Sequence, residues 1–69
     1  MTKLPERLQF LKTERKLMQK DIAAALKLPL RTYQRYERGE GEPNVSTLVR
    51  MARYFQVSTD YLLGLKEEP

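Results

Sequence analysis

Three arginines, Arg31, Arg35 and Arg38, recur at spacings of four and three residues between Leu30 and Arg38. In an α-helix, which turns by about 100° per residue, they share one face, and Gln34 lies beside them. A guanidinium is a rigid fork of donors that matches O6 and N7 of guanine, and the major groove of DNA admits one helix. The spacing is therefore typical of a helix that reads base edges, although a solvated basic helix face has the same spacing.

The positive charge of the chain is concentrated around this segment. The 69 residues include 13 basic and 9 acidic side chains, for a net charge of +4. Residues 12–38 contain eight basic and three acidic side chains, whereas the rest of the chain has five and six. Such a local excess favours a polyanionic partner such as nucleic acid.

The composition excludes most enzyme chemistry. The sequence contains no cysteine and no histidine, which rules out disulfides, Cys/His zinc sites and Ser-His or Cys-His nucleophile pairs. Glu40 and Glu42 lie in a loop with glycine and proline, without a third catalytic group nearby in sequence. We therefore expect a protein that is not an enzyme, with no metal or other cofactor and no small-molecule ligand.

Membrane insertion and secretion are not indicated either. The longest apolar run, Ile22–Leu26, is far too short to cross a bilayer. The N-terminal segment MTKLPERLQF has charges where a signal peptide has its apolar stretch. These features favour the cytoplasm.

Hydrophobic periodicity predicts an all-α fold of five short helices. The expected helices span about Pro5–Arg15, Gln19–Leu26, Leu30–Arg38, Val45–Gln56 and Thr59–Leu63. Asn44 and Ser58 are favourable N-caps for the last two, and Gly39 and Gly64 suit the left-handed positions that often follow helices.

The apolar faces of these helices predict the core. Its expected aliphatic and aromatic members are Leu4, Leu8, Leu11, Ile22, Ala23, Leu26, Val45, Leu48, Val49, Ala52 and Phe55. Tyr33 and Tyr36 lie opposite the arginines, so we assign them to core packing rather than to base stacking. Arg50, Arg53 and Tyr54 are expected to point away from the core.

The sequence also resembles a known family. Residues 19–39, QKDIAAALKLPLRTYQRYERG, are similar to the helix-turn-helix of the Cro and cI-type phage repressors, the Xre-type regulators, and the similarity continues through EPNVSTLVRMARYFQVSTDYLLG. The resemblance implies a compact five-helix lambda-repressor-like DNA-binding domain, with the helix-turn-helix at about residues 19–38. It also implies a domain at residues 1–64, followed by a tail or the start of a linker at residues 65–69.

The resemblance implies a set of DNA-contacting residues. They are Gln19, Lys20, Leu30, Arg31, Thr32, Gln34, Arg35 and Arg38. Gln19 matches a glutamine that contacts a phosphate and braces the recognition helix, while Arg31 and Arg35 match base-reading positions. Leu30 would either touch a thymine methyl group or pack.

The resemblance also implies an ion pair beneath the recognition helix. Glu37 matches a glutamate that pairs with an arginine on the first helix, and Lys12 occupies that arginine's position. A lysine keeps the charge but loses the bidentate geometry. An ordinary surface pair between Lys12 and Glu37 is the alternative.

Several residues depart from the family's pattern. Met18 stands where a capping Ser or Thr is usual, Lys27 where a turn glycine is common, and Pro29 where a hydroxyl cap is expected before the recognition helix. Glu40 and Glu42 lie near the expected DNA backbone, where carboxylates repel phosphate unless they point aside.

The implied function is a sequence-specific transcriptional regulator that binds double-stranded DNA. The resemblance favours a phage or prophage repressor that binds a palindromic operator as a homodimer in the bacterial cytoplasm or nucleoid. Tyr61, Leu62 and Leu65 are candidates for the dimer surface, although Leu62 equally fits the core. The alternatives are a restriction-modification controller and an antitoxin-type protein-interaction module that autoregulates, the latter disfavoured by the few residues after Gly64.

Overall fold

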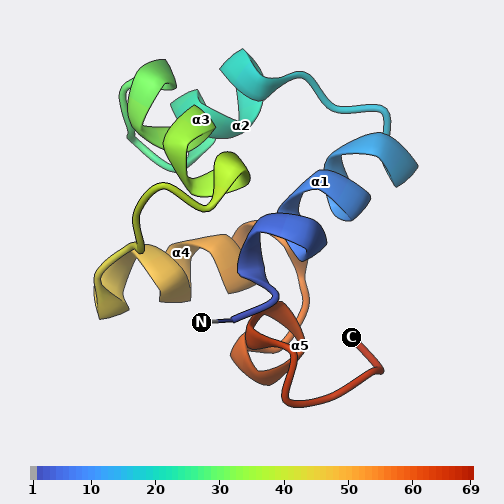
Figure 1. Ribbon diagram of the computed structural model, residues 1–69. Coiled ribbons are helices and arrows are strands. Elements are labelled where there is room, and N and C mark those ends of the chain that lie inside the picture. The colour runs from blue at the N-terminus through green and yellow to red at the C-terminus, as the bar shows by residue number, and fades with distance from the viewer. Residues whose placement is uncertain (1) are drawn as a thin grey trace.

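The computed structural model describes residues 2–69, which form five α-helices and no β-strand (Figure 1). In chain order they are α1 (Leu4–Glu14), α2 (Gln19–Ala25), α3 (Leu30–Arg38), α4 (Val45–Phe55) and α5 (Thr59–Leu63). The predicted all-α fold is confirmed, and each helix begins and ends within one residue of its expected position. None of these helices combines the length and apolar character that crossing a membrane requires.

Side-chain caps fix the start of two helices but not of α2. The Asn44 side chain accepts a hydrogen bond from the Thr47 amide at 2.8 Å at the start of α4. Ser58 accepts one from the Tyr61 amide at 3.0 Å at the start of α5. Met18 precedes α2 in an extended conformation without any side-chain cap, as the sequence indicates.

Left-handed residues end most of the helices. Gly39 and Gly64 follow α3 and α5 with φ of 73° and 85°, the conformation expected for both. Lys16, Lys27 and Gln56 also have positive φ, between 56° and 59°, although each carries a side chain that disfavours this region. The turn after α2 therefore needs the left-handed backbone that a glycine would supply, and Lys27 adopts it.

One core joins all five helices. Its largest fully buried side chains are Leu8, Leu11, Ile22, Leu26, Tyr33, Met51, Phe55 and Leu62. The predicted apolar faces of α1 and α2 are confirmed, since Leu4 and Ala23 are buried as well. Tyr33 is fully buried and Tyr36 packs against the core, so both tyrosines lie where the sequence places them.

The predicted inner face of α4 is wrong in part. Val45 is 77% exposed and Val49 is half-buried outside the core, whereas Thr47 and Met51 are buried and Tyr54 packs against the core. The core face is turned from the predicted face by roughly 70–80° at about 100° per residue. Val45 is the first residue of α4 and is exposed there, whereas Met51 completes the apolar row Leu48, Met51, Ala52 and Phe55 at helical spacing.

The helices are arranged so that α1 lies against both α3 and α5, while α2 contacts α3 and α4 contacts α5. In Figure 1, α2 and α3 lie at the top and the C-terminus lies beside α5 at the bottom. The C-terminal tail folds back onto the domain, where the Ser58 amide donates to the Pro69 carbonyl at 3.0 Å. Arg7 on α1 contacts the same tail through Glu67, at 3.5 Å.

Candidate nucleic-acid interface

A short turn joins α2 to α3. The Leu28 amide donates to the Ala23 carbonyl at 2.9 Å, which closes the end of α2. Pro29 then follows in an extended conformation with ψ of 143°, and α3 begins at the next residue. Since proline fixes φ and α2 packs against α3, the turn sets the angle at which α3 is presented to solvent.

The two faces of α3 differ completely in their surroundings. Tyr33 and Glu37 are buried on the inner face. Arg31, Arg35 and Arg38 are exposed on the outer face, as the helical spacing predicts. One side of the helix is therefore anchored in the domain, and the other presents its basic side chains to solvent.

Glu37 ties α3 to α1 and α2. Its side chain is only 5% exposed, and its Oε1 accepts from Lys12 Nζ at 2.9 Å. The same oxygen accepts from Gln19 Nε2 at 3.0 Å, while Gln9 Nε2 donates to the Glu37 backbone carbonyl at 2.6 Å. The Lys12–Glu37 contact is thus a largely buried link between helices rather than an ordinary surface pair.

The surroundings of Glu37 favour its ionised form. Burial opposes ionisation, but the nearby Tyr33 hydroxyl, the hydrogen bonds from Lys12 and Gln19 and the charge of Lys12 outweigh burial and lower the pKa of Glu37. Burial and the adjacent Glu37 raise the pKa of Tyr33 above its ordinary range. The Tyr33 hydroxyl lies near the Glu37 carboxylate but outside hydrogen-bond geometry. Within residues 2–69, neither this hydroxyl nor Glu37 Oε2 has a hydrogen-bond partner.

Gln19 continues this network toward the outer surface. Its Oε1 accepts from Gln34 Nε2 at 3.0 Å, while its own Nε2 donates to Glu37. Gln19 therefore braces α3 through two of that helix's side chains. This bracing is the arrangement that the resemblance implies for Gln19, and it also fixes the side chain of Gln34.

The three arginines of α3 have different surroundings. Arg38 donates twice to the Glu40 carboxylate, from Nε to Oε2 at 2.9 Å and from Nη2 to Oε1 at 3.1 Å. Arg35 Nη2 donates to the Glu40 backbone carbonyl at 3.1 Å. Within the part of the chain that the structure describes, Arg31 forms no ion pair or side-chain hydrogen bond.

The other predicted DNA-contacting residues differ in exposure. Lys20 is exposed on α2, and Thr32 is half-buried on α3. Leu30, the first residue of α3, is 42% exposed. All eight predicted residues lie on α2 and α3, and Leu30 is partly exposed instead of being sealed in the core.

The predicted dimer candidates need correction. Tyr61 is 4% exposed and Leu62 is fully buried, so neither is available to a second chain in this conformation. Arg7 covers the Tyr61 ring, with the guanidinium carbon 4.3 Å from the ring centroid. Leu65 is 73% exposed and remains the one candidate of the three on the surface.

Two contacts at this interface were not expected from the sequence. Gln9 on α1 supports the end of α3, for which a lone glutamine on an amphipathic helix gives no signal. Glu40, expected to repel phosphate unless it points aside, instead binds Arg38. A separation of two residues across Gly39 does not predict this pair, because the contact also depends on the conformations of both side chains.

Two short helices joined by a tight turn, the second buried on one side and basic on the other, define a helix-turn-helix DNA-binding domain. Sequence comparison gives the same result. The chain belongs to the helix-turn-helix family, whose sequence model matches residues 8–62. This is a family of DNA-binding transcriptional regulators and not of enzymes.

Individual relatives agree with this assignment. The chain is 34% identical over 64 residues to the uncharacterized HTH-type transcriptional regulator YobD of Bacillus subtilis, covering 93% of this chain and 57% of YobD. A transcriptional regulator from Listeria innocua is similar over 100% of this chain and 64% of its own length, with a TM-score of 0.89 and 36% identity. The DNA-binding domain of the P22 C2 repressor gives a TM-score of 0.81 and 28% identity over 87% of this chain and 79% of that domain. The chain thus spans less than two thirds of YobD and of the Listeria protein.

Proposed function

We propose that this chain recognises a double-stranded DNA operator by inserting α3 into the major groove. Arg31 and Arg35 are assigned to base edges, since a guanidinium matches guanine O6 and N7. Gln19, Lys20 and Arg38 are assigned to the phosphate backbone, which positions the helix without reading sequence. The observation that carries this proposal is the basic outer face of α3 on a helix whose inner face is anchored in the domain.

We further propose that the regulator binds as a two-fold dimer on an inverted repeat. α3 has nine residues and is about 14 Å long, so one copy reads only a few base pairs. Two copies related by a two-fold axis would read half-sites about one helical turn apart. The exposed Leu65 is the remaining candidate for the contact between copies.

Similarity to the P22 C2 repressor domain supports a repressor of phage or prophage type. Repression requires only that the operator be occupied, and the domain offers a binding face without a catalytic centre. We assign this activity to the bacterial cytoplasm, where the operator DNA lies.

The test is selection of bound sequences from random duplex DNA at about physiological salt, where non-specific binding is weak. We expect enrichment of an inverted repeat with half-site centres about one turn apart. Enrichment of a single half-site would contradict the dimer and leave the α3 reading in place. Absence of enrichment would contradict operator binding by this chain.

Two variants assign the readout to α3. The double variant Arg31→Ala/Arg35→Ala removes both proposed base contacts and should abolish enrichment. Arg53→Ala removes an exposed arginine from α4 and should select the wild-type sequence, because Arg53 lies outside the proposed interface. If both variants selected the same sequence, the assignment of α3 as the reading helix would be wrong.

A further inference from the structure

The loop after α3 contacts two of the arginines proposed to bind DNA, Arg35 and Arg38. Gly39 turns the chain with φ of 73°, which places Glu40 beside the last turn of the helix. There the Glu40 carboxylate receives both hydrogen bonds from Arg38, and its carbonyl receives one from Arg35. A Cβ built on Gly41 would lie 3.6 Å from Arg35 Nη2, so the loop backbone passes close to this guanidinium as well.

The Arg38–Glu40 pair is not explained by fold stability. Both side chains are about half-exposed, at 52% and 54%, and exposed ion pairs contribute little to folding. The pair does change the charge that α3 presents, because a carboxylate bound in bidentate fashion occupies the donors with which an arginine contacts a phosphate.

We propose that Glu40 is an internal counter-anion that competes with the DNA backbone for Arg38 and so weakens binding of α3 to DNA of any sequence. This inference rests on the proposed function, since it concerns the same face of α3. Contact of Arg38 with a phosphate requires that Glu40 be displaced, whereas the base contact assigned to Arg31 does not depend on that displacement.

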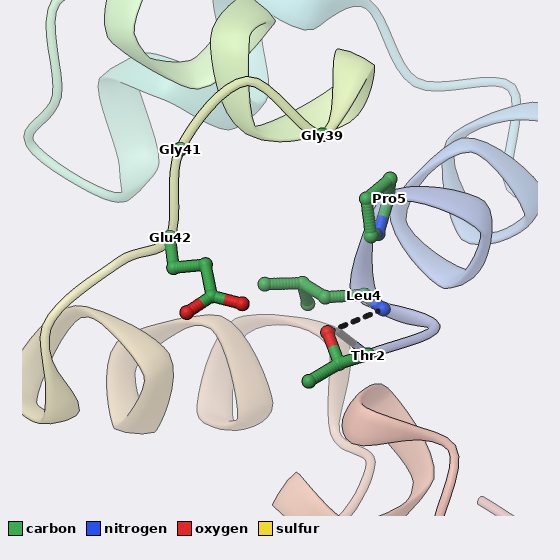
Figure 2. A pocket seen from close by; sticks show the side chains of 6 residues that line it. All are labelled: Thr2, Leu4, Pro5, Gly39, Gly41 and Glu42. Carbon is green, nitrogen blue, oxygen red and sulfur yellow. Dashed lines mark hydrogen bonds between the residues drawn. The ribbon is translucent and has the colours of Figure 1, made fainter.

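Glu42 provides a matched control within the same loop. It is the same residue type two positions further on, and within residues 2–69 its carboxylate forms no ion pair. Figure 2 shows the Glu42 side chain directed toward Leu4 and Thr2, at a cavity of about 70 Å³ that these residues line with Gly39 and Gly41. Removing the charge of Glu42 therefore changes the net charge of the loop without releasing an arginine.

The expected effect follows from counterion release. Each additional phosphate contact changes the slope of log K against log[salt] by about −0.9, so a contact that adds nothing at 1 M salt strengthens binding roughly eightfold at 0.1 M. Releasing Arg38 should therefore increase affinity for a random-sequence duplex by about five- to tenfold. An unpaired carboxylate such as that of Glu42 repels DNA only through an electric field that salt screens over about 10 Å. Removing its charge should increase affinity for the duplex by about twofold or less.

The experiment measures affinity of the 69-residue chain for a random-sequence duplex of about two helical turns, by fluorescence anisotropy at about 0.1 M salt. Glu40→Gln should bind about five- to tenfold more tightly than wild type, and Glu42→Gln about twofold or less. Equal gains for the two variants would overturn the inference, because loop charge alone would then explain both. Circular dichroism should show the same helix content for every variant, since the substituted side chains are exposed.

A double-mutant comparison isolates the contact itself. In an Arg38→Ala background, Glu40→Gln should gain no more than Glu42→Gln does in the wild type, because the released partner is absent. A gain in affinity of about five- to tenfold from Glu40→Gln in the Arg38→Ala background would overturn the inference. If wild type bound the duplex and Glu40→Gln bound it equally well, the inference would fail while the proposed function stood. Absence of binding by every variant, on random and selected duplexes alike, would instead refute the proposed function.

Discussion

Replacing Glu37 by glutamine tests the network that anchors α3. The substitution keeps the shape of the side chain but removes the charge that Lys12 Nζ contacts at 2.9 Å and Gln19 Nε2 at 3.0 Å. A hydrogen bond to a charged group contributes about 1.5–3 kcal/mol, and a neutral amide retains only part of it. We therefore expect Glu37→Gln to lower the free energy of unfolding by about 1.5–3 kcal/mol, or Tm by roughly 6–24 °C for a domain of this size.

The same variant predicts a specific dependence on pH. The pKa of Glu37 in the folded state lies below its ordinary value of 4.5, so near that pH the unfolded state binds more protons than the folded state. The stability that Glu37 contributes is therefore complete above the ordinary value and is lost as pH falls through the folded pKa. The difference in stability between wild type and Glu37→Gln should be largest near neutral pH and should shrink in acid.

Thermal denaturation followed by circular dichroism from about pH 7 to about pH 3 measures both effects. Glu14→Gln is the control, because Glu14 is exposed on α1, and its unfolding free energy should change by less than about 0.5 kcal/mol. A Glu37→Gln protein with the same Tm as wild type at neutral pH would contradict the anchoring role of Glu37. A difference in stability that stayed constant across the pH range would refute the assignment of the acid sensitivity to Glu37.

Four further substitutions test other parts of the argument. Met18→Ser supplies the missing N-cap acceptor of α2 and should raise the unfolding free energy by about 1 kcal/mol in thermal melts, whereas an unchanged Tm would show that the cap is not needed. Lys27→Gly relieves the left-handed backbone at φ of 59° and should stabilise by about 0.5–1 kcal/mol, and a lower Tm would contradict strain at this turn. Gln19→Ala should weaken binding to every duplex alike, so a changed base preference in the selection would show that its backbone role is wrong. Arg35→Ala should cost about 1–3 kcal/mol on the selected operator and relax one base position, while equal loss on all duplexes would make Arg35 a phosphate contact.

The sequence predicts best where a side chain's position follows from local geometry. The two faces of α3 follow from helical periodicity, because Tyr33 and the arginines are separated by a fixed rotation about one axis. The caps at Asn44 and Ser58 follow from short side chains that reach an amide three residues on. These features need no knowledge of the rest of the chain.

Prediction fails where the tertiary arrangement decides. The core face of α4 includes Thr47, a polar residue that hydrophobicity along α4 does not assign to the core. Tyr61 carries a polar group typical of surfaces, but the stacked guanidinium of Arg7 covers its ring. The binding of Arg38 by Glu40 likewise depends on side-chain conformations that sequence spacing leaves open.

The position of the C-terminus has a practical consequence for the assays. The last residue lies beside α5, on the side of the molecule away from α2 and α3 (Figure 1). A fluorophore or surface linker attached there would leave the proposed DNA-binding face directed toward solution. The Ser58 amide contacts the Pro69 carbonyl, and this contact would restrict a label attached next to it. Such a label would therefore report tumbling of the whole domain when DNA binds, rather than local motion of a free end.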